Sequence, residues 1–189
     1  MFIGIFCSAN ANIPDLYFEE TKRLGRWIGE NGHSLVWGGC SLGLMETVGR
    51  SFLEGRSLSA EGSGGSLIGV VPSIIEERGK VFSPMDSTIR CSNLSQRKDM
   101  IVENSDVLIA LPGGIGTLDE IFTVVSSSTI GYHSKKMLIY DVGGFWQPLK
   151  NLMDHLEKEG MIRGDYRSRI VFCSSLDEIK RFSLSGTED

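Results

Sequence analysis

The stretch DVLIALPGGIGTLDEIFTVV, residues 106–125, joins an apolar run to a helical repeat through a turn rich in glycine. The apolar run at 106–110 has the length of a strand buried on both faces, and the residues from Leu118 onward return to helical spacing. At such a junction, backbone N–H groups can surround a phosphate. The turn is not a P-loop, because no Gly-Lys-Ser/Thr follows, nor a dinucleotide fingerprint, because Asp119 stands in place of the third glycine. By itself, the turn does not identify a ligand.

Strand-like and helical runs alternate along the rest of the chain. This alternation predicts a doubly wound α/β fold, in which helices cover both faces of a parallel sheet. The expected strands are Phe2–Cys7, Ser34–Trp37, Leu67–Val71, Thr88–Cys91, Asp106–Leu111, Met137–Tyr140 and Ile170–Cys173. The expected helices are Asp15–Glu30, Leu44–Glu54, Leu94–Asn104, Leu118–Ile130, Phe145–Glu159 and a short one after Ser175. We expect residues 57–66, rich in serine and glycine, to form a flexible loop and the last residues to be disordered.

Size and composition restrict the class of protein. The chain has 189 residues, of which 41% are hydrophobic, and this predicts a single domain (1–189) with a sizeable core. The net charge of −5 argues against a nucleic-acid partner. We expect no membrane association, because no segment has the length of a membrane span. The apolar start MFIGIFCSA is too short for a signal peptide and predicts the first strand.

The cysteines and histidines do not predict a metal site. The four cysteines are far apart and form no CxxC pair, so we expect reduced thiols and a cytoplasmic location. The three histidines are isolated, and none has a carboxylate at ligand spacing. We therefore expect neither a metal nor another cofactor.

Four turns should meet at the carboxyl edge of the predicted sheet, where α/β folds bind their ligands. They are CSAN (7–10), GGCSLGLM (38–45), the start of the helix at Leu94, and PGGIGT (112–117). Two glycine-rich turns at one edge favour a nucleotide-like ligand more strongly than one turn alone. Ser8 and Gly39, in the first and second of these turns, are candidate ligand contacts.

Arg97 is a candidate ligand residue because of its place on a predicted helix. Leu94, Arg97 and Ile101 share the inward face of that helix, so Arg97 lies near the first turn, at the ligand edge. An arginine there needs a phosphate or a carboxylate as its partner. The alternative is that Arg97 and Lys98 are surface cations with their stems along the core, which is usual for an isolated pair. The predicted proximity of PGGIGT favours a ligand for Arg97, whereas Lys98 fits either interpretation.

Two interpretations fit the acids behind the glycine turn. Thr117 and Glu120 have the spacing of a capping box, with Thr117 as the N-cap and Glu120 reaching back from the third helical position. Asp119 is favourable at the positive end of a helix. Spacing alone favours capping over catalysis. The two roles are compatible, however, because a carboxylate beside a phosphate-holding turn can also face the sugar attached to that phosphate.

Taken together, these motifs resemble the LONELY GUY (LOG) family, the phosphoribohydrolases that activate cytokinins. The chain carries Arg97-Lys98 ahead of the family signature PGGxGTxxE, and also GG-x-S-x-GLM, IGVVP, GYHSKK and GGFWQPLKNLMDHLEKEGMI. The resemblance covers most of the chain. It implies a Rossmann-like fold, a homodimer, and hydrolysis of the N-glycosidic bond of a nucleoside 5′-monophosphate. The products are the free base and ribose 5-phosphate, and the substrate is AMP or an N6-substituted adenosine (cytokinin riboside) monophosphate.

The resemblance also implies roles for individual residues. The family's essential arginine and glutamate fall on Arg97 and Glu120, and its substrate-contacting threonine falls on Ser126. A further substrate-binding glutamate falls on Glu77 or its neighbour Glu76. The other residues expected to hold substrate or phosphate are Lys98, Gly113, Gly114, Ile115, Gly116 and Thr117.

Two departures from the family pattern leave the base specificity open. Cys40 replaces the third glycine of the second turn, and Ser95-Gln96 replaces a His-Glu pair before Arg97. Cleavage of the N-glycosidic bond itself passes through an oxocarbenium-like sugar, which a carboxylate can stabilise. Glu120 is the candidate for that carboxylate, and Arg97 either binds the phosphate or orients Glu120.

Two other classes of protein remain as alternatives. A non-catalytic carrier of a nucleotide or of the molybdenum cofactor can use the same crevice in the same fold. A pyridoxal-phosphate decarboxylase is the second alternative, because related sequences carry a lysine decarboxylase label. No lysine is convincingly placed for that chemistry.

Overall fold

A seven-stranded parallel sheet forms the framework of the computed structural model, which describes residues 1–59 and 64–185. The strand order is β4-β3-β2-β1-β5-β6-β7, and every neighbouring pair is parallel. The strands are β1 (Phe2–Phe6), β2 (Ser34–Trp37), β3 (Leu67–Pro72), β4 (Ser87–Cys91), β5 (Val107–Ala110), β6 (Met137–Tyr140) and β7 (Ile170–Cys173). The predicted doubly wound α/β fold is confirmed, and each predicted strand agrees with the observed one to within one residue at either end.

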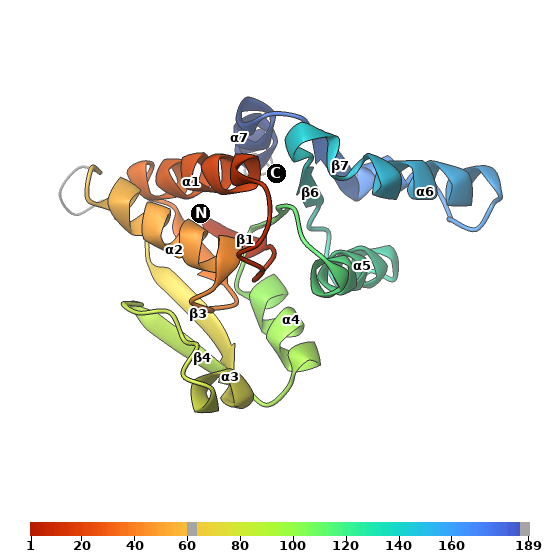
Figure 1. Cartoon of the computed structure of the whole chain (residues 1–189). Helices are drawn as coiled ribbons and strands as arrows, with labels where there is room; N and C mark the ends of the chain where they lie inside the picture. Colours follow the sequence, from red (N-terminus) through yellow and green to blue (C-terminus); the bar gives the residue numbers. More distant parts are fainter. Residues whose placement is uncertain (60–63, 186–189) are drawn as a thin grey trace.

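Helices cover both faces of the sheet, as Figure 1 shows. One face carries α1 (Asp15–Glu30), α2 (Gly43–Arg56) and α7 (Leu176–Ser185). The other face carries α4 (Leu94–Glu103), α5 (Ile115–Thr129) and α6 (Gln147–Lys158). The sequence did not predict three short elements, namely α3 (Ser73–Glu77), η1 (Val142–Gly144) and η2 (Tyr166–Ser168).

The central strands contribute to two hydrophobic cores, one on each face. Successive side chains of a strand point to opposite faces. On β1, Ile3 and Ile5 therefore pack with residues of α1 and α2, whereas Phe6 packs with residues of α4 and α5. Burial on both faces explains why the central strands read as continuous apolar runs instead of alternating ones.

The strand order reverses at β1, which has β2 on one side and β5 on the other. This switch point is where a doubly wound sheet leaves a crevice beyond its carboxyl edge. Ser8, just after β1, connects the two glycine-rich turns there. Its N–H donates to the carbonyl of Pro112 at 3.2 Å, and its carbonyl accepts from the N–H of Leu44 at 2.9 Å. The predicted meeting of turns is thus confirmed for these three segments.

Two predictions concern segments that are described only in part or not at all. The flexible loop predicted at 57–66 includes residues 60–63, and the last residues of the chain, for which disorder is predicted, include 186–189. Both ranges lie outside the described residues. In the part of the chain that is described, no helix has both the length and the apolar character that a membrane crossing requires.

Candidate active site

A cavity of about 240 Å³ lies at the switch point of the sheet. Its walls come from the end of β1 and from the first turns of α2, α4 and α5. The lining residues are Cys7, Ser8, Ala9, Met45, Leu94, Arg97, Lys98, Gly114, Gly116, Thr117, Asp119 and Glu120. The structure therefore brings together most of the residues that the sequence places in a phosphate and sugar site.

Glu120 is the buried carboxylate of this cavity. The residue is only 7% exposed, and no other described residue offers its carboxylate a hydrogen bond or an ion pair. Burial raises the pKa of Glu120 from 4.5 to about 7; the positive charge of Arg97 lowers it, and the negative charge of Asp119 raises it further. Such a carboxyl group exchanges its proton near neutral pH, as groups in acid–base chemistry do.

The predicted capping box at Thr117 and Glu120 is wrong. Helix α5 starts within the glycine turn, with Gly114 as its N-cap and no side-chain cap. The N–H of Leu118 already donates to the carbonyl of Gly114 at 3.0 Å. Thr117 is therefore a buried residue of the first turn, and Glu120 lies in the second turn, too far along the helix to reach back to the N-cap. Capping does not account for either residue.

The glycines of the turn leave room for a ligand. A Cβ atom on Gly113 would lie 2.1 Å from Oγ1 of Thr117, so packing within the chain requires this glycine. By contrast, a Cβ on Gly114 or Gly116 would meet nothing within 4 Å. These two glycines line the cavity at the uncapped start of α5, where the positive end of the helix favours an anion.

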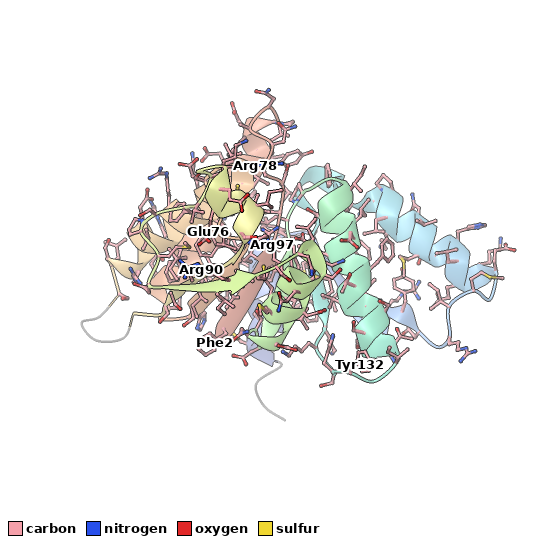
Figure 2. All side chains as sticks on the ribbon, turned by 90° about the horizontal axis from the view of Figure 1, so that it is seen from below. Phe2, Glu76, Arg78, Arg90, Arg97 and Tyr132 are labelled. Carbon is pink, nitrogen blue, oxygen red and sulfur yellow. The ribbon has the colours of Figure 1, made fainter. Side chains whose placement is uncertain are left out.

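Arg97 is a part-buried cation without a carboxylate partner among residues 1–59 and 64–185. Its Nε donates to the carbonyl of Val70 at 3.3 Å, and its Nη2 lies 3.8 Å from Sδ of Met45. A Cβ on Gly38 would lie 1.4 Å from Nη2, so only glycine at position 38 leaves space for the guanidinium. Figure 2 shows Arg97 nearer the centre of the molecule than Arg90, which belongs to the edge strand β4. An anionic ligand would supply the missing partner.

Comparisons with known proteins identify the family. The family model described as "Possible lysine decarboxylase" matches residues 53–181. A probable cytokinin riboside 5′-monophosphate phosphoribohydrolase from Oryza sativa subsp. japonica is 31% identical over 179 residues, which cover 95% of this chain and 77% of the relative. The chain belongs to the LOG family. A phosphoribohydrolase of the same name from Rhodococcoides fascians is 30% identical over 93% of this LOG-family chain and 85% of its own length.

Solved structures share the fold of this LOG-family chain. The molybdenum cofactor carrier protein from Chlamydomonas reinhardtii matches with a TM-score of 0.73 and 19% identity, over 100% of this chain and 98% of that one. The molybdenum cofactor binding protein from Rippkaea orientalis matches with a TM-score of 0.69 and 21% identity, over 97% and 95% of the two chains. At these identities, the similarity shows the fold alone.

The start of α4 is fixed by a cap that the sequence analysis missed. Oδ1 of Asn93 accepts a hydrogen bond from the N–H of Gln96 at 2.9 Å, and Oε1 of Gln96 accepts one from the N–H of Ser92 at 2.8 Å. The N-x-x-Q spacing was the available signal. In this LOG-family chain, the reciprocal cap positions the turn that carries Arg97 and Lys98.

Lys98 reaches across the cavity to Asp119. Its Nζ lies 2.7 Å from each carboxylate oxygen of Asp119, so the ion pair joins α4 to α5. The side chain of Lys98 is only 13% exposed, which does not fit an ordinary surface cation. Sequence spacing gives no signal for this pair, because its two residues are 21 positions apart.

Five predicted ligand contacts are not among the residues that line the cavity of the LOG-family chain. They are Gly113, described above, Ser126, described below, and Ile115, Gly39 and Glu77. Ile115 is 88% exposed at the start of α5. Gly39 is required by packing, because its φ is +59° and a Cβ there would lie 2.7 Å from Cγ2 of Val71. Glu77 is exposed at the end of α3. Glu77 was suggested by the family resemblance, and Ile115 and Gly39 lie within the two glycine-rich turns; none of the three lines the cavity.

The alternative glutamate, Glu76, is also absent from the cavity lining. Its carboxylate pairs with Nε of Arg90 at 3.0 Å, so it already has a cationic partner at the β4 edge of the sheet. Neither Glu76 nor Glu77 contributes to the described site of the LOG-family chain.

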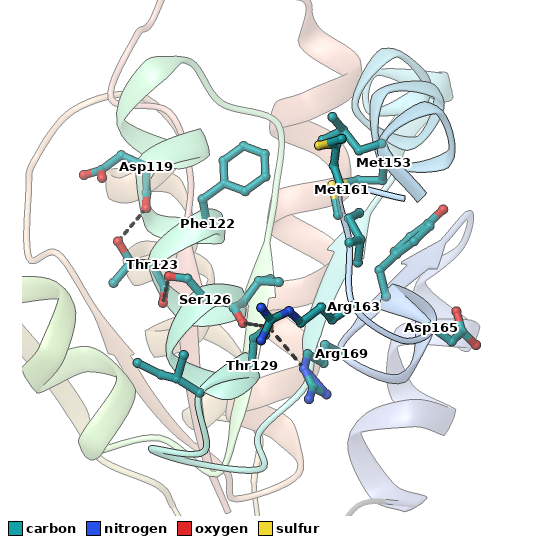
Figure 3. Close-up of a pocket in the computed structure, with 15 residues that line it drawn as sticks. Asp119, Phe122, Thr123, Ser126, Thr129, Met153, Met161, Arg163, Asp165 and Arg169 are labelled. Atoms are coloured by element: carbon teal, nitrogen blue, oxygen red, sulfur yellow. Dashed lines mark hydrogen bonds between the residues drawn. The ribbon is translucent and has the colours of Figure 1, made fainter. Parts of the chain in front are cut away.

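Ser126 lies in a second, larger hollow of about 670 Å³ between α5, α6 and η2. Figure 3 shows Phe122 and Ser126 of α5 on one side of this groove and Met153 of α6 with Met161 on the other. Its apolar lining also includes Val125, Leu156 and Ile162. Asp119 lines both the groove and the cavity, so the two hollows of the LOG-family chain adjoin each other.

Proposed function

We propose that this chain hydrolyses the N-glycosidic bond of a nucleoside 5′-monophosphate to the free base and ribose 5-phosphate. Glu120 carries the proposal, because it is a buried carboxylate without a protein partner, in a cavity that also contains an unpaired arginine and an uncapped helix start. The names of the two relatives specify cytokinin riboside 5′-monophosphates, which supports an adenosine monophosphate with an N6 substituent as substrate. AMP is the unsubstituted alternative.

The phosphate binds at the start of α5. Backbone N–H groups of the turn and the hydroxyl of Thr117 offer donors, and Gly114 and Gly116 allow the phosphate to approach the backbone closely. Arg97, which approaches from α4, either pairs with the phosphate or orients Glu120. Holding the phosphate fixes the sugar relative to the carboxylate, and this positioning lowers the entropic part of the barrier.

Glu120 acts on the sugar. As the bond between C1′ and the base nitrogen breaks, positive charge grows on the ribose, and an ionised carboxylate nearby stabilises it. The same carboxylate can accept a proton from the water that attacks C1′, while the base nitrogen leaves with the electron pair of the broken bond and takes a proton from solvent. Because the pKa of Glu120 is about 7, the ionised form is well populated at neutral pH, and the reaction should become faster as pH rises through that value.

The description of the family model suggests a second activity, the decarboxylation of lysine, but the structure supports this activity less well than hydrolysis. Among the described residues that line the cavity, Lys98 is the one lysine, and Asp119 holds its ammonium group on both carboxylate oxygens. A pyridoxal-phosphate enzyme requires a lysine amine that is free to bond to the cofactor.

Release of free base from a panel of monophosphates tests the proposal. AMP, N6-substituted adenosine monophosphates and the corresponding nucleosides would each be incubated with purified protein, and free base would be quantified by chromatography. We expect cleavage of monophosphates and little cleavage of nucleosides, which lack the anchoring phosphate. A protein that binds the monophosphates but releases no base would be a carrier, and the proposal would be wrong.

Substitution of Gly116 by alanine should separate stability from binding. Gly116 is the second residue of α5, and its missing Cβ would meet nothing within 4 Å, so alanine should raise the free energy of unfolding by about 0.5–1 kcal/mol. The same methyl group would occupy space next to the bound phosphate and should raise KM for the monophosphate at least about tenfold. Thermal unfolding and initial-rate kinetics on one preparation measure both effects. An unchanged KM would exclude the phosphate from this turn.

We also propose a homodimer in which a second copy covers the groove between α5 and α6. The groove exposes Phe122 and Met161 in a lining that is mainly apolar, and such patches are typical of protein interfaces. Ser126 lines this groove and not the cavity, so a second copy seated there would cover Ser126. The four buried cysteines, which form no disulfide in the structure, support the further proposal of a cytoplasmic location.

Light scattering tests the dimer. The wild-type chain of 20.8 kDa should have twice that mass at micromolar concentration, and Phe122→Glu should reduce it to a single chain because a carboxylate in an apolar interface is unfavourable. Leu58→Glu is the matched control, because Leu58 is exposed and lies outside the groove. A wild-type mass of 20.8 kDa would contradict the dimer.

A further inference from the structure

The ion pair between Lys98 and Asp119 spans the cavity that contains Glu120. Lys98 projects from α4 and Asp119 from α5, and both line the cavity. The Nζ atom lies 2.7 Å from each carboxylate oxygen, so the ion pair joins the two helices. Asp119 directly precedes Glu120 in the chain, so this pair lies next to the candidate catalytic carboxylate.

Four titratable groups face Glu120 from the elements packed around it. Arg97 and Lys98 on α4 favour its ionised form, and Asp119 on α5 opposes it. Cys7, at the end of β1, lines the cavity as well. Burial and the proximity of Glu120 raise the pKa of the Cys7 thiol well above its usual value, so it stays neutral. The charges that act on Glu120 are therefore those of Arg97 and of the Lys98–Asp119 pair.

We propose that Lys98 and Asp119 are positioning residues whose pairing across the cavity keeps the charge of either one from acting alone on Glu120. The proposal rests on the function proposed above for Glu120. In an intact pair, the fields of the ammonium and carboxylate groups largely cancel at a neighbouring site. Loss of one partner exposes Glu120 to the full charge of the other, and the direction of the change depends on which partner is lost.

Removal of each partner separately tests this pair. The variants are Asp119→Asn, Lys98→Met and the double substitution. Asp99→Asn serves as the matched control, because Asp99 is an exposed aspartate next to Lys98 in the sequence and does not line the cavity. Two quantities are measured against pH for each protein. One is kcat/KM for the monophosphate that the wild type cleaves best, and the other is the free energy of unfolding, which depends on Glu120 whether or not the protein is an enzyme.

The two single variants should shift the acidic limb of the kcat/KM profile, where activity falls as pH decreases, in opposite directions. In Asp119→Asn, the acidic limb of kcat/KM should move to lower pH by on the order of 0.5–1 unit, the effect of one charge a few ångströms away in a protein. In Lys98→Met it should move to higher pH by a similar amount. The double variant should shift less than either single variant, and Asp99→Asn should not shift. The midpoint of the pH-dependent change in unfolding free energy should move in the same directions.

The outcomes distinguish failure of this inference about the ion pair from failure of the proposed function. Suppose that the wild type releases base, and that both single variants have the same acidic limb of kcat/KM and the same pH midpoint of unfolding free energy as the wild type. The pair then has no role beyond structure, and this inference is wrong. Shifts of both single variants in the same direction would also overturn it. If no base is released by any protein, the proposed function fails, and the unfolding midpoints still decide whether the pair controls the ionisation of Glu120.

Discussion

Glu120→Gln should lower kcat by about 10²–10⁴-fold while monophosphate affinity stays near that of the wild type. Glutamine has nearly the same shape as glutamate, so the cavity is preserved. Its neutral amide cannot balance the positive charge that grows on the ribose, nor accept a proton from water. Affinity is retained because the donors of the glycine turn and Arg97 are unchanged, and removal of a negative charge near the phosphate can only strengthen binding.

The same substitution should stabilise the fold above neutral pH. The folded-state pKa of Glu120 is about 7, above the unfolded value of 4.5, because burial disfavours the charged form. Below pH 4.5 the group is protonated in both states. Between these values only the unfolded chain ionises, so the free energy of unfolding falls as pH rises, by up to about 3 kcal/mol. Glutamine avoids this loss, so Glu120→Gln should be the more stable protein at pH 8 and similar to wild type at pH 4.

Thermal unfolding at the two pH values, together with kinetics, checks this prediction. Higher stability with lost turnover is typical of a residue kept for function. Unchanged stability at pH 8 would show that Glu120 is already solvated or paired in the folded state. Turnover of Glu120→Gln within a few-fold of the wild type would show that Glu120 is not the catalytic carboxylate.

Arg97→Ala is the second substitution with a large expected effect. We expect kcat/KM to fall by about 10²–10³-fold, because the cation that meets the phosphate or orients Glu120 is lost. Stability should change little, since Arg97 forms no ion pair with a carboxylate of the described chain and only a long hydrogen bond, 3.3 Å, to the carbonyl of Val70. Removal of the positive charge should also raise the pKa of Glu120 further and move the acidic limb of the kcat/KM profile to higher pH.

Arg90→Ala is the matched control for Arg97→Ala. Arg90 is exposed, pairs with Glu76 at 3.0 Å and does not line the cavity, so its loss should leave kcat/KM near the wild-type value. Near-normal kinetics for Arg97→Ala would show that Arg97 is a surface cation with no role in the reaction. Equal losses for both variants would indicate a general effect of charge and not a specific site.

The fold was predictable because its signals are local. Apolar runs such as 137–140 and 170–173 end where polar or glycine residues begin, so their strands agree with the structure. The start of α5 was not predictable in this way. Thr117 has the side chain of an N-cap, but the glycines before it permit the helix to begin at Ile115. Backbone freedom at glycine is not visible in a residue pattern.

The candidate site was predictable where one motif supplies several residues, and not where distant segments meet. The glycine turn gave Gly114, Gly116, Thr117 and Glu120 together. The space that Gly38 leaves for Arg97, by contrast, depends on contacts between residues far apart in sequence. The same applies to the pairing of Lys98 with Asp119.

The most direct test of the account compares wild type and Glu120→Gln on one N6-substituted adenosine monophosphate. Free base and ribose 5-phosphate are quantified over time, and binding of the monophosphate is measured by calorimetry on the same preparations. The account predicts equimolar base and ribose 5-phosphate from the wild type, and binding without release from the variant. Equal rates of base release from the two proteins, or binding without release by the wild type, would contradict it.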